Sequence, residues 1–152
     1  MRYSKIPVNF LSERAIKSLS VETRLIAFYL MTAPRINRIG LYYVSVQEIS
    51  NRLQLDSYYV RVALYNLEQV NFCRYDVCHE YIWICDYALW QEHRGTCELL
   101  LKNLPPLSFV NEFYRRYASL CYPPELTYQA TEHVEILKYS YIDSRKNHHG
   151  GN

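Results

Sequence analysis

The sequence predicts an α+β fold, and three observations lead to this prediction. Two stretches, residues 45–53 and 56–69, repeat apolar residues at helical spacing and are separated only by a tight turn. Two β-rich runs follow, over 72–75 and 81–85, around a polar stretch. Helix, short turn, helix and hairpin in this order are typical of a winged helix-turn-helix domain, to which the later residues add a small helical C-terminal extension.

Ahead of this unit, the residues predict an extended arm, two helices, a loop and a strand, over 1–11, 12–19, 21–32, 35–39 and 40–44. The second helix has Ser20 as its N-cap and ends at Ala33-Pro34. It is apolar on nearly all sides, which predicts that it is buried or forms part of an oligomer interface. The strand is expected to pair with the later hairpin and so complete a small sheet.

The helix-turn-helix is predicted from its caps and its apolar spacing. Ser45-Val46-Gln47-Glu48 is an S-x-x-E capping box, which starts the first helix. Asp56 or Ser57 can cap the second helix after the turn. The predicted core-facing stripe of this second helix recurs at i, i+3, i+4 and i+7, and consists of Val60, Ala63, Leu64 and Leu67.

After the hairpin, the chain is expected to form one helical turn over 86–91 and then two further helices. These are capped by Thr96 and Ser108 and are stopped by two proline pairs. The expected domains are a winged helix-turn-helix domain over 1–91, a helical extension over 92–124 and a partly disordered tail over 125–152.

Composition and charge limit the class of protein. A chain of 152 residues with 49% hydrophobic content suits one domain with a core of its own. The formal net charge is only +2, so binding of nucleic acid must depend on a local patch. No signal peptide opens the chain and no run of eighteen apolar residues occurs, which predicts a cytoplasmic protein without a membrane span. The five cysteines contain no C-x-x-C pair and are expected to be free thiols.

The outward face of the second helix is the main candidate site. With the apolar stripe inward, the helical wheel places outward Tyr58, Val62, Tyr65 and Gln69, flanked by Arg61 and Asn66. Arginine pairs with guanine, amides pair with adenine, valine can touch a thymine methyl, and tyrosine hydroxyls suit phosphates. A phosphate-contacting rim is expected from Arg35, Arg38, Arg52 and Arg74. These features predict binding of double-stranded DNA. A protein-binding surface is the alternative, because Tyr and Arg also dominate protein interfaces.

No motif indicates an enzyme or a bound cofactor. The four glycines do not form a P-loop, and the only adjacent histidines, His148 and His149, lie in the predicted tail. The hairpin region holds a group of thiols and imidazole at Cys73, Cys78, His79 and Cys85. Zinc sites usually show tighter cysteine pairs, so we predict neither a metal site nor catalytic residues.

Four short motifs carry a resemblance to a known family: Thr23-Arg24-Leu25, Tyr29-Leu30-Met31-Thr32, Gly40-Leu41-Tyr42 and Arg74-Tyr75-Asp76. Together with the helix-turn-helix, they resemble the winged-helix N-terminal domain of bacteriophage and prophage replication proteins, of the replisome-organiser or replication-initiator type. The resemblance covers about residues 3–91, with a weaker similarity over 109–117 and 139–143. It departs from the family at Gln54, where a glycine is usual, and in a shorter region after the winged helix.

This resemblance implies binding of origin or promoter DNA, in replication initiation or transcription control. It also implies partners among replication proteins, such as a helicase or its loader, and a location in the host cytoplasm at the nucleoid. From the residues themselves we expect a homodimer. The apolar helix over 21–32 and a later apolar stripe either pack on each other or meet across a two-fold axis. That stripe consists of Phe109, Val110, Phe113, Tyr117 and Leu120.

Overall fold

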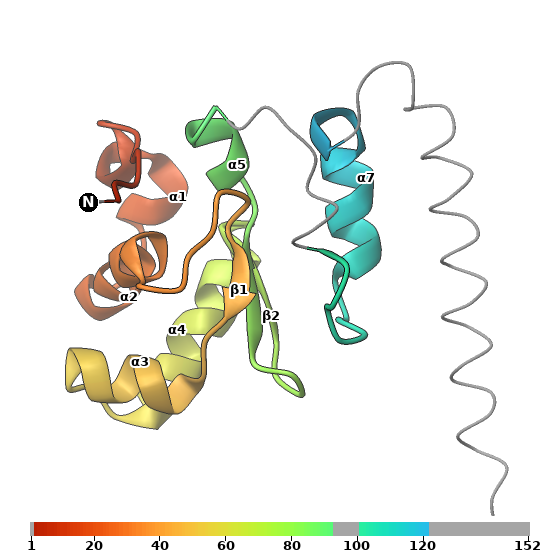
Figure 1. The fold of residues 1–152 in the computed structure, drawn as a ribbon. Helices are drawn as coiled ribbons and strands as arrows, with labels where there is room; N and C mark the ends of the chain where they lie inside the picture. Colours follow the sequence, from red (N-terminus) through yellow and green to blue (C-terminus); the bar gives the residue numbers. More distant parts are fainter. Residues whose placement is uncertain (1, 93–100, 122–152) are drawn as a thin grey trace, which may run out of the picture. The chain divides into compact units, whose positions relative to one another are not determined.

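The computed structural model describes residues 2–92 and 101–121 (Figure 1). The chain forms two compact units, residues 1–93 and 94–152. Within its described residues, the first unit has the helical elements η1 (Phe10–Ser12), α1 (Arg14–Lys17), α2 (Val21–Thr32), α3 (Val46–Leu53), α4 (Ser57–Gln69) and α5 (Tyr87–Trp90). Its strands are β1 (Leu41–Tyr43), β2 (Cys73–Asp76) and β3 (Tyr81–Ile84). The unit is therefore α+β, and its order of elements is compatible with a winged helix.

Helix α2 has the predicted bounds and the predicted N-cap. The side-chain oxygen of Ser20 accepts a hydrogen bond of 3.1 Å from the backbone N–H of Thr23. The helix is buried on one side only, along Ile26, Ala27, Leu30 and Met31. Val21 and Leu25 on the other side are exposed, so burial on nearly all sides is wrong for a single chain. Helix α2 therefore has more apolar side chains than the core of one chain buries.

The turn between α3 and α4 is held by local hydrogen bonds. Gln54 takes a left-handed conformation with φ 55°, at the position where a glycine costs least. The backbone N–H of Leu55 donates to the carbonyl of Ser50 at 3.1 Å, and the hydroxyl of Ser50 donates to the carbonyl of Leu55. These bonds satisfy the end of α3, so the turn forms without glycine.

Both helices of this pair begin at the predicted caps. The side-chain oxygen of Ser45 accepts from the N–H of Glu48 at 2.9 Å. Asp56, rather than Ser57, caps α4, because its carboxylate accepts from the N–H of Tyr58 at 2.8 Å. The negative carboxylate at the N-terminus also suits the dipole of α4.

The early strand pairs with the hairpin, as the sequence predicts, and the three strands form an antiparallel sheet in the order β1-β3-β2. The strand β2 begins and ends one residue later than predicted, and β3 ends one residue earlier. Gly40 precedes β1 with φ +70°, and a Cβ atom there would lie 2.6 Å from the Cβ of Tyr87. The start of β1 therefore requires glycine.

One face of this sheet and three helices enclose the core of the first unit. The predicted stripe of α4 is buried throughout. It packs in one cluster with Ile26, Leu30, Ile49, Ile82 and Ile84. The hydroxyl of Tyr42 on β1 donates to the carbonyl of Leu30 at 2.6 Å and so joins the sheet to the end of α2. Burial raises the pKa of Tyr42 well above its ordinary value, which keeps this donor protonated.

The N-terminal arm is tethered. Phe10 belongs to the 3-10 helix η1 and is buried, so the prediction of an extended segment as far as residue 11 is wrong at this end. The hydroxyls of Ser4 and Tyr87 lie 2.8 Å apart. The side chain of Gln91 accepts from the N–H of Lys5 at 2.9 Å and donates to its carbonyl at 2.8 Å. These contacts attach the arm to α5.

The second unit contains α7 (Val110–Cys121) in its described part. Phe109, Phe113 and Tyr117 are buried in a single chain, and the rings of Phe113 and Tyr117 lie 5.1 Å apart. This part of the predicted stripe is therefore covered without a second copy. The predicted helix after Thr96, the side chain of Leu120 and the predicted tail lie outside the described residues.

The stripe of α4 gives a test of the helix orientation. Leu64→Ala and Leu67→Ala should each lower the free energy of unfolding by about 2–5 kcal/mol, because each leaves a cavity in the core. Urea denaturation measures the loss. Val62→Ala, on the outward side of the same helix, is the matched control and should change stability by no more than about 0.5 kcal/mol. Unchanged midpoints for both leucine variants would contradict this orientation.

Candidate nucleic-acid interface

The outward face of α4 carries the side chains that the helical wheel predicts. Tyr58 is 68% exposed and Tyr65 is 60% exposed. Arg61 and Gln69 are exposed as well, Val62 is partly so, and Asn66 is half-buried. The face thus offers one guanidinium, two amides, aromatic rings and hydroxyls to a partner.

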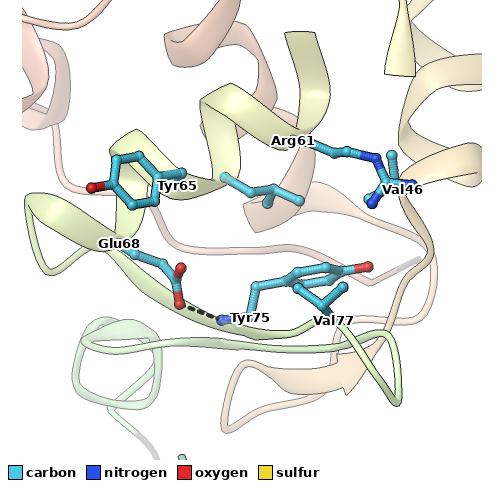
Figure 2. A pocket seen from close by; sticks show the side chains of 7 residues that line it. Val46, Arg61, Tyr65, Glu68, Tyr75 and Val77 are labelled. Carbon is cyan, nitrogen blue, oxygen red and sulfur yellow. Dashed lines mark hydrogen bonds between the residues drawn. The ribbon is translucent and has the colours of Figure 1, made fainter. Parts of the chain in front are cut away.

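The one carboxylate of α4 is turned away from this face. An oxygen of Glu68 accepts a hydrogen bond of 2.9 Å from the backbone N–H of Tyr75 on β2 (Figure 2). Strand β2 lies at the edge of the sheet, where backbone groups have no strand partner on one side. The contact therefore covers an edge N–H group and turns the carboxylate of Glu68 toward β2, although Glu68 lines the same pocket as Arg61 and Tyr65.

Arg74 is placed differently from the other predicted rim arginines. Its guanidinium donates to the carbonyls of Glu68 at 3.3 Å and of Cys73 at 3.0 Å, and to the side-chain oxygen of Asn71 at 2.9 Å. The side chain is half-buried. These contacts join the end of α4 to the beginning of β2, which indicates a positioning role for Arg74 rather than a free phosphate contact.

Arg35 lies over an aromatic ring beside the hairpin. Its guanidinium carbon is 5.4 Å from the centre of the Tyr43 ring, a cation–π distance. The hydroxyl of Tyr43 donates to a carboxylate oxygen of Glu80 at 2.9 Å. This hydrogen bond is the main reason that the pKa of Tyr43 is raised. Arg35 is exposed to solvent, but the carboxylate of Glu80 is bonded to the same tyrosine that Arg35 covers.

Arg52 and Arg38 are also exposed. The positive charges of Arg52 and Arg35 both act to lower the pKa of Tyr29, against larger effects that raise it. The hydroxyl of Tyr29 donates to Glu48 at 3.4 Å, and burial followed by the charge of Glu48 raises the pKa of Tyr29. Arg35 lies over Tyr43 and Glu48 is bonded to Tyr29, so carboxylates lie among the arginines of the predicted rim.

Local charge is the feature that sequence reasoning missed. Residues 41–91, which hold the helix-turn-helix and the hairpin, carry three arginines against six acidic residues, a net charge of −3. Residues 2–40 carry seven basic against two acidic residues, a net charge of +5. A sum over 1–91 hides this division. Any phosphate-binding rim depends on cations that the first forty residues contribute.

A pocket of about 230 Å³ lies between α4 and the hairpin (Figure 2). Helix α4 lines it with Arg61, Leu64, Tyr65 and Glu68, and the opposite side consists of Val46, Tyr75 and Val77. Figure 2 shows the guanidinium of Arg61 beside Val46 and the carboxylate of Glu68 at the other end. No sequence pattern predicts this pocket, because Val77 lies within the polar stretch between the two predicted β-rich runs.

The hairpin thiols are not gathered as the ligands of a metal ion would be. Cys73 and Cys85 are buried, and Cys78 is exposed. Burial raises the pKa of the Cys73 thiol well above its ordinary value, so this side chain is a neutral thiol in the core. Within residues 2–92 and 101–121, no three His, Cys, Asp or Glu side chains come close enough to share a metal ion. In the same ranges, no helix has the length and hydropathy needed to cross a membrane.

Comparisons of the chain with protein-family profiles, with curated proteins and with solved structures gave no match. Function is therefore inferred from the side chains themselves.

The contacts of Arg74 give a second test. Arg74→Ala should lower the free energy of unfolding by about 1–3 kcal/mol, because partly buried acceptors lose their donors. Urea denaturation measures this loss. Arg52→Ala, an exposed arginine at the end of α3, is the matched control and should leave the midpoint unchanged. Equal midpoints for wild type and Arg74→Ala would show that the guanidinium contacts do not hold α4 to β2.

Proposed function

We propose that this protein binds double-stranded DNA through a winged helix-turn-helix, with α4 in the major groove and the β2–β3 hairpin as the wing. The supporting observation is the outward face of α4. It presents Arg61, Asn66 and Gln69, which are base-reading side-chain types, and its one carboxylate is bonded to Tyr75 instead of facing outward. A carboxylate that points into the groove would repel phosphates, so its orientation toward β2 suits a DNA-binding surface, although its charge remains.

Each outward side chain has a role that follows from its chemistry. Arg61 pairs with a guanine, Asn66 and Gln69 pair with adenines, and Val62 touches a thymine methyl. The hydroxyls of Tyr58 and Tyr65 donate to phosphates and fix the register of the helix.

The rim of this interface is smaller than the sequence predicted. Arg35, Arg38 and Arg52 are exposed and can neutralise phosphates. Arg74 holds α4 against β2 instead. Because residues 41–91 are net acidic, the arginines of the loop before β1 are essential to the electrostatics of binding.

The resemblance to phage replication proteins suggests the biological setting of this binding. It favours origin or promoter DNA, in replication initiation or transcription control, within the cytoplasm of a host cell. A helicase or a helicase loader would be the replication partner. None of these assignments depends on the geometry of α4, and each can fail while DNA binding holds.

Substitutions on α4 test the proposal. A selection from random duplexes should yield a preferred site for the full chain, and Arg61→Ala should weaken binding to it by about 1–3 kcal/mol at the guanine it contacts. Tyr65→Ala should weaken binding to all duplexes. Arg14→Ala, an exposed arginine on α1, is the control. Equal affinities for wild type, Arg61→Ala and Tyr65→Ala, with intact thermal melting, would reject α4 as the reading helix.

Salt dependence separates DNA binding from the protein-binding alternative. If Arg35, Arg38 and Arg52 all neutralise phosphates, log K should fall with log salt at a slope of about −3. The measurement is fluorescence anisotropy of a labelled duplex between low and physiological salt. No measurable duplex binding, or a slope near zero, would favour a protein-interaction module on the same scaffold.

A homodimer would let two copies of α4 read two half-sites one helical turn apart. Its interface is proposed on the exposed side of α2, where Val21 is 67% exposed and Leu25 is also exposed. Light scattering of the full chain should then give the mass of two chains, and Leu25→Glu should give the mass of one. A wild-type chain that stays monomeric at high micromolar concentration would exclude this dimer.

A further inference from the structure

The pocket between α4 and the hairpin contains apolar surface that has no role in the proposed reading of DNA. Its floor and walls include Val46, Leu64, Tyr75 and Val77, which offer apolar surface. The polar groups of Tyr75 are already occupied, because its hydroxyl donates to the carbonyl of Val44 at 3.1 Å and its backbone N–H donates to Glu68. The floor therefore has no hydrogen bond to offer a base edge, and it favours an apolar group.

The size of the pocket limits what it can hold. Its volume of about 230 Å³ is below the range of about 300–1,000 Å³ that is typical of small-molecule sites. One large apolar side chain, such as that of Leu, Phe or Trp, is a better match than a free ligand. Val77 at the rim is 66% exposed, so the hairpin presents apolar surface to a partner as well as to the pocket.

Charge decides which apolar segment fits. Among the described residues, no hydrogen bond or ion pair engages the guanidinium of Arg61, which lies beside Val46 at one end of the pocket (Figure 2). The carboxylate of Glu68 lies at the other end and is bonded to Tyr75. A segment that places a carboxylate next to its apolar side chain, at the Arg61 end of the pocket, would therefore meet a cation there and lie away from the negative charge of Glu68 at the other end.

We infer that this pocket binds a peptide segment of a partner protein, in which a large apolar side chain stands within two residues of Asp or Glu. The apolar side chain fills the space over Leu64 and Tyr75, and the carboxylate accepts hydrogen bonds from Arg61. Arg61 and Tyr65 also belong to the proposed DNA-reading face, so this segment and DNA exclude each other. The inference requires the pocket and not the DNA-binding function.

A peptide selection tests this inference with the full chain. The probe is a displayed library of random twelve-residue peptides, selected on the immobilised wild-type protein. The selected peptides should share a large apolar residue within two positions of an acidic residue. The dissociation constant of the best peptide is then measured by fluorescence anisotropy, for the wild type and for three variants.

The variants separate peptide binding from DNA binding. Arg61→Leu and Val77→Asn should each weaken the peptide by about tenfold or more, through the lost charged hydrogen bond and the lost apolar wall respectively. Both residues lie at the surface, so the fold should remain, as a thermal melt checks. Arg52→Leu should leave the peptide unchanged while it weakens duplex DNA.

Four results would overturn the inference. These are no enrichment of any peptide, enriched peptides without the apolar–acidic pair, equal peptide affinity for Val77→Asn and wild type, or equal peptide affinity for Arg61→Leu and wild type. Failure of DNA binding would appear instead as a duplex affinity that no arginine variant changes, so the two failures are distinguishable.

Discussion

The junction between α4 and β2 fixes the geometry on which the candidate site depends. Glu68 takes part twice, because its carboxylate accepts from the N–H of Tyr75 and its carbonyl accepts from the guanidinium of Arg74. The first contact covers an edge N–H group of the sheet, and the second covers a carbonyl in the last turn of α4. With both in place, the outward face of α4 and the wall made by the hairpin keep one relative position.

The same junction shapes the electrostatics of the surface. Several carboxylates of residues 41–91 accept internal hydrogen bonds, at the caps of α3 and α4, on β2 and beside β1. Such bonds orient the carboxylates but do not cancel their charge, so this region keeps its net charge of −3. Attraction of a polyanion must therefore come from local contacts on α4 and from the basic first forty residues. This explains why charge summed over a domain is a poor guide to this site.

One helix face serves both proposals, and this sharing has a physical consequence. Arg61 and Tyr65 point outward for DNA and also border the pocket beside the hairpin. A partner segment bound there would remove the guanidinium from the groove-facing surface, and bound DNA would close the pocket to the segment. By linkage, each partner would lower the apparent affinity of the other.

The sequence by itself determined the features that depend on near neighbours in the chain. The bounds of α2, the caps Ser20 and Ser45, and the buried stripe of α4 follow from spacing and cap chemistry within a few residues, and the structure confirms them. Only the tertiary structure decided that Glu68 turns away, that Arg74 holds a junction and that Val77 borders a pocket. Each of these depends on how closely α4 approaches the hairpin, and this distance is set by packing of the whole core rather than by a local pattern.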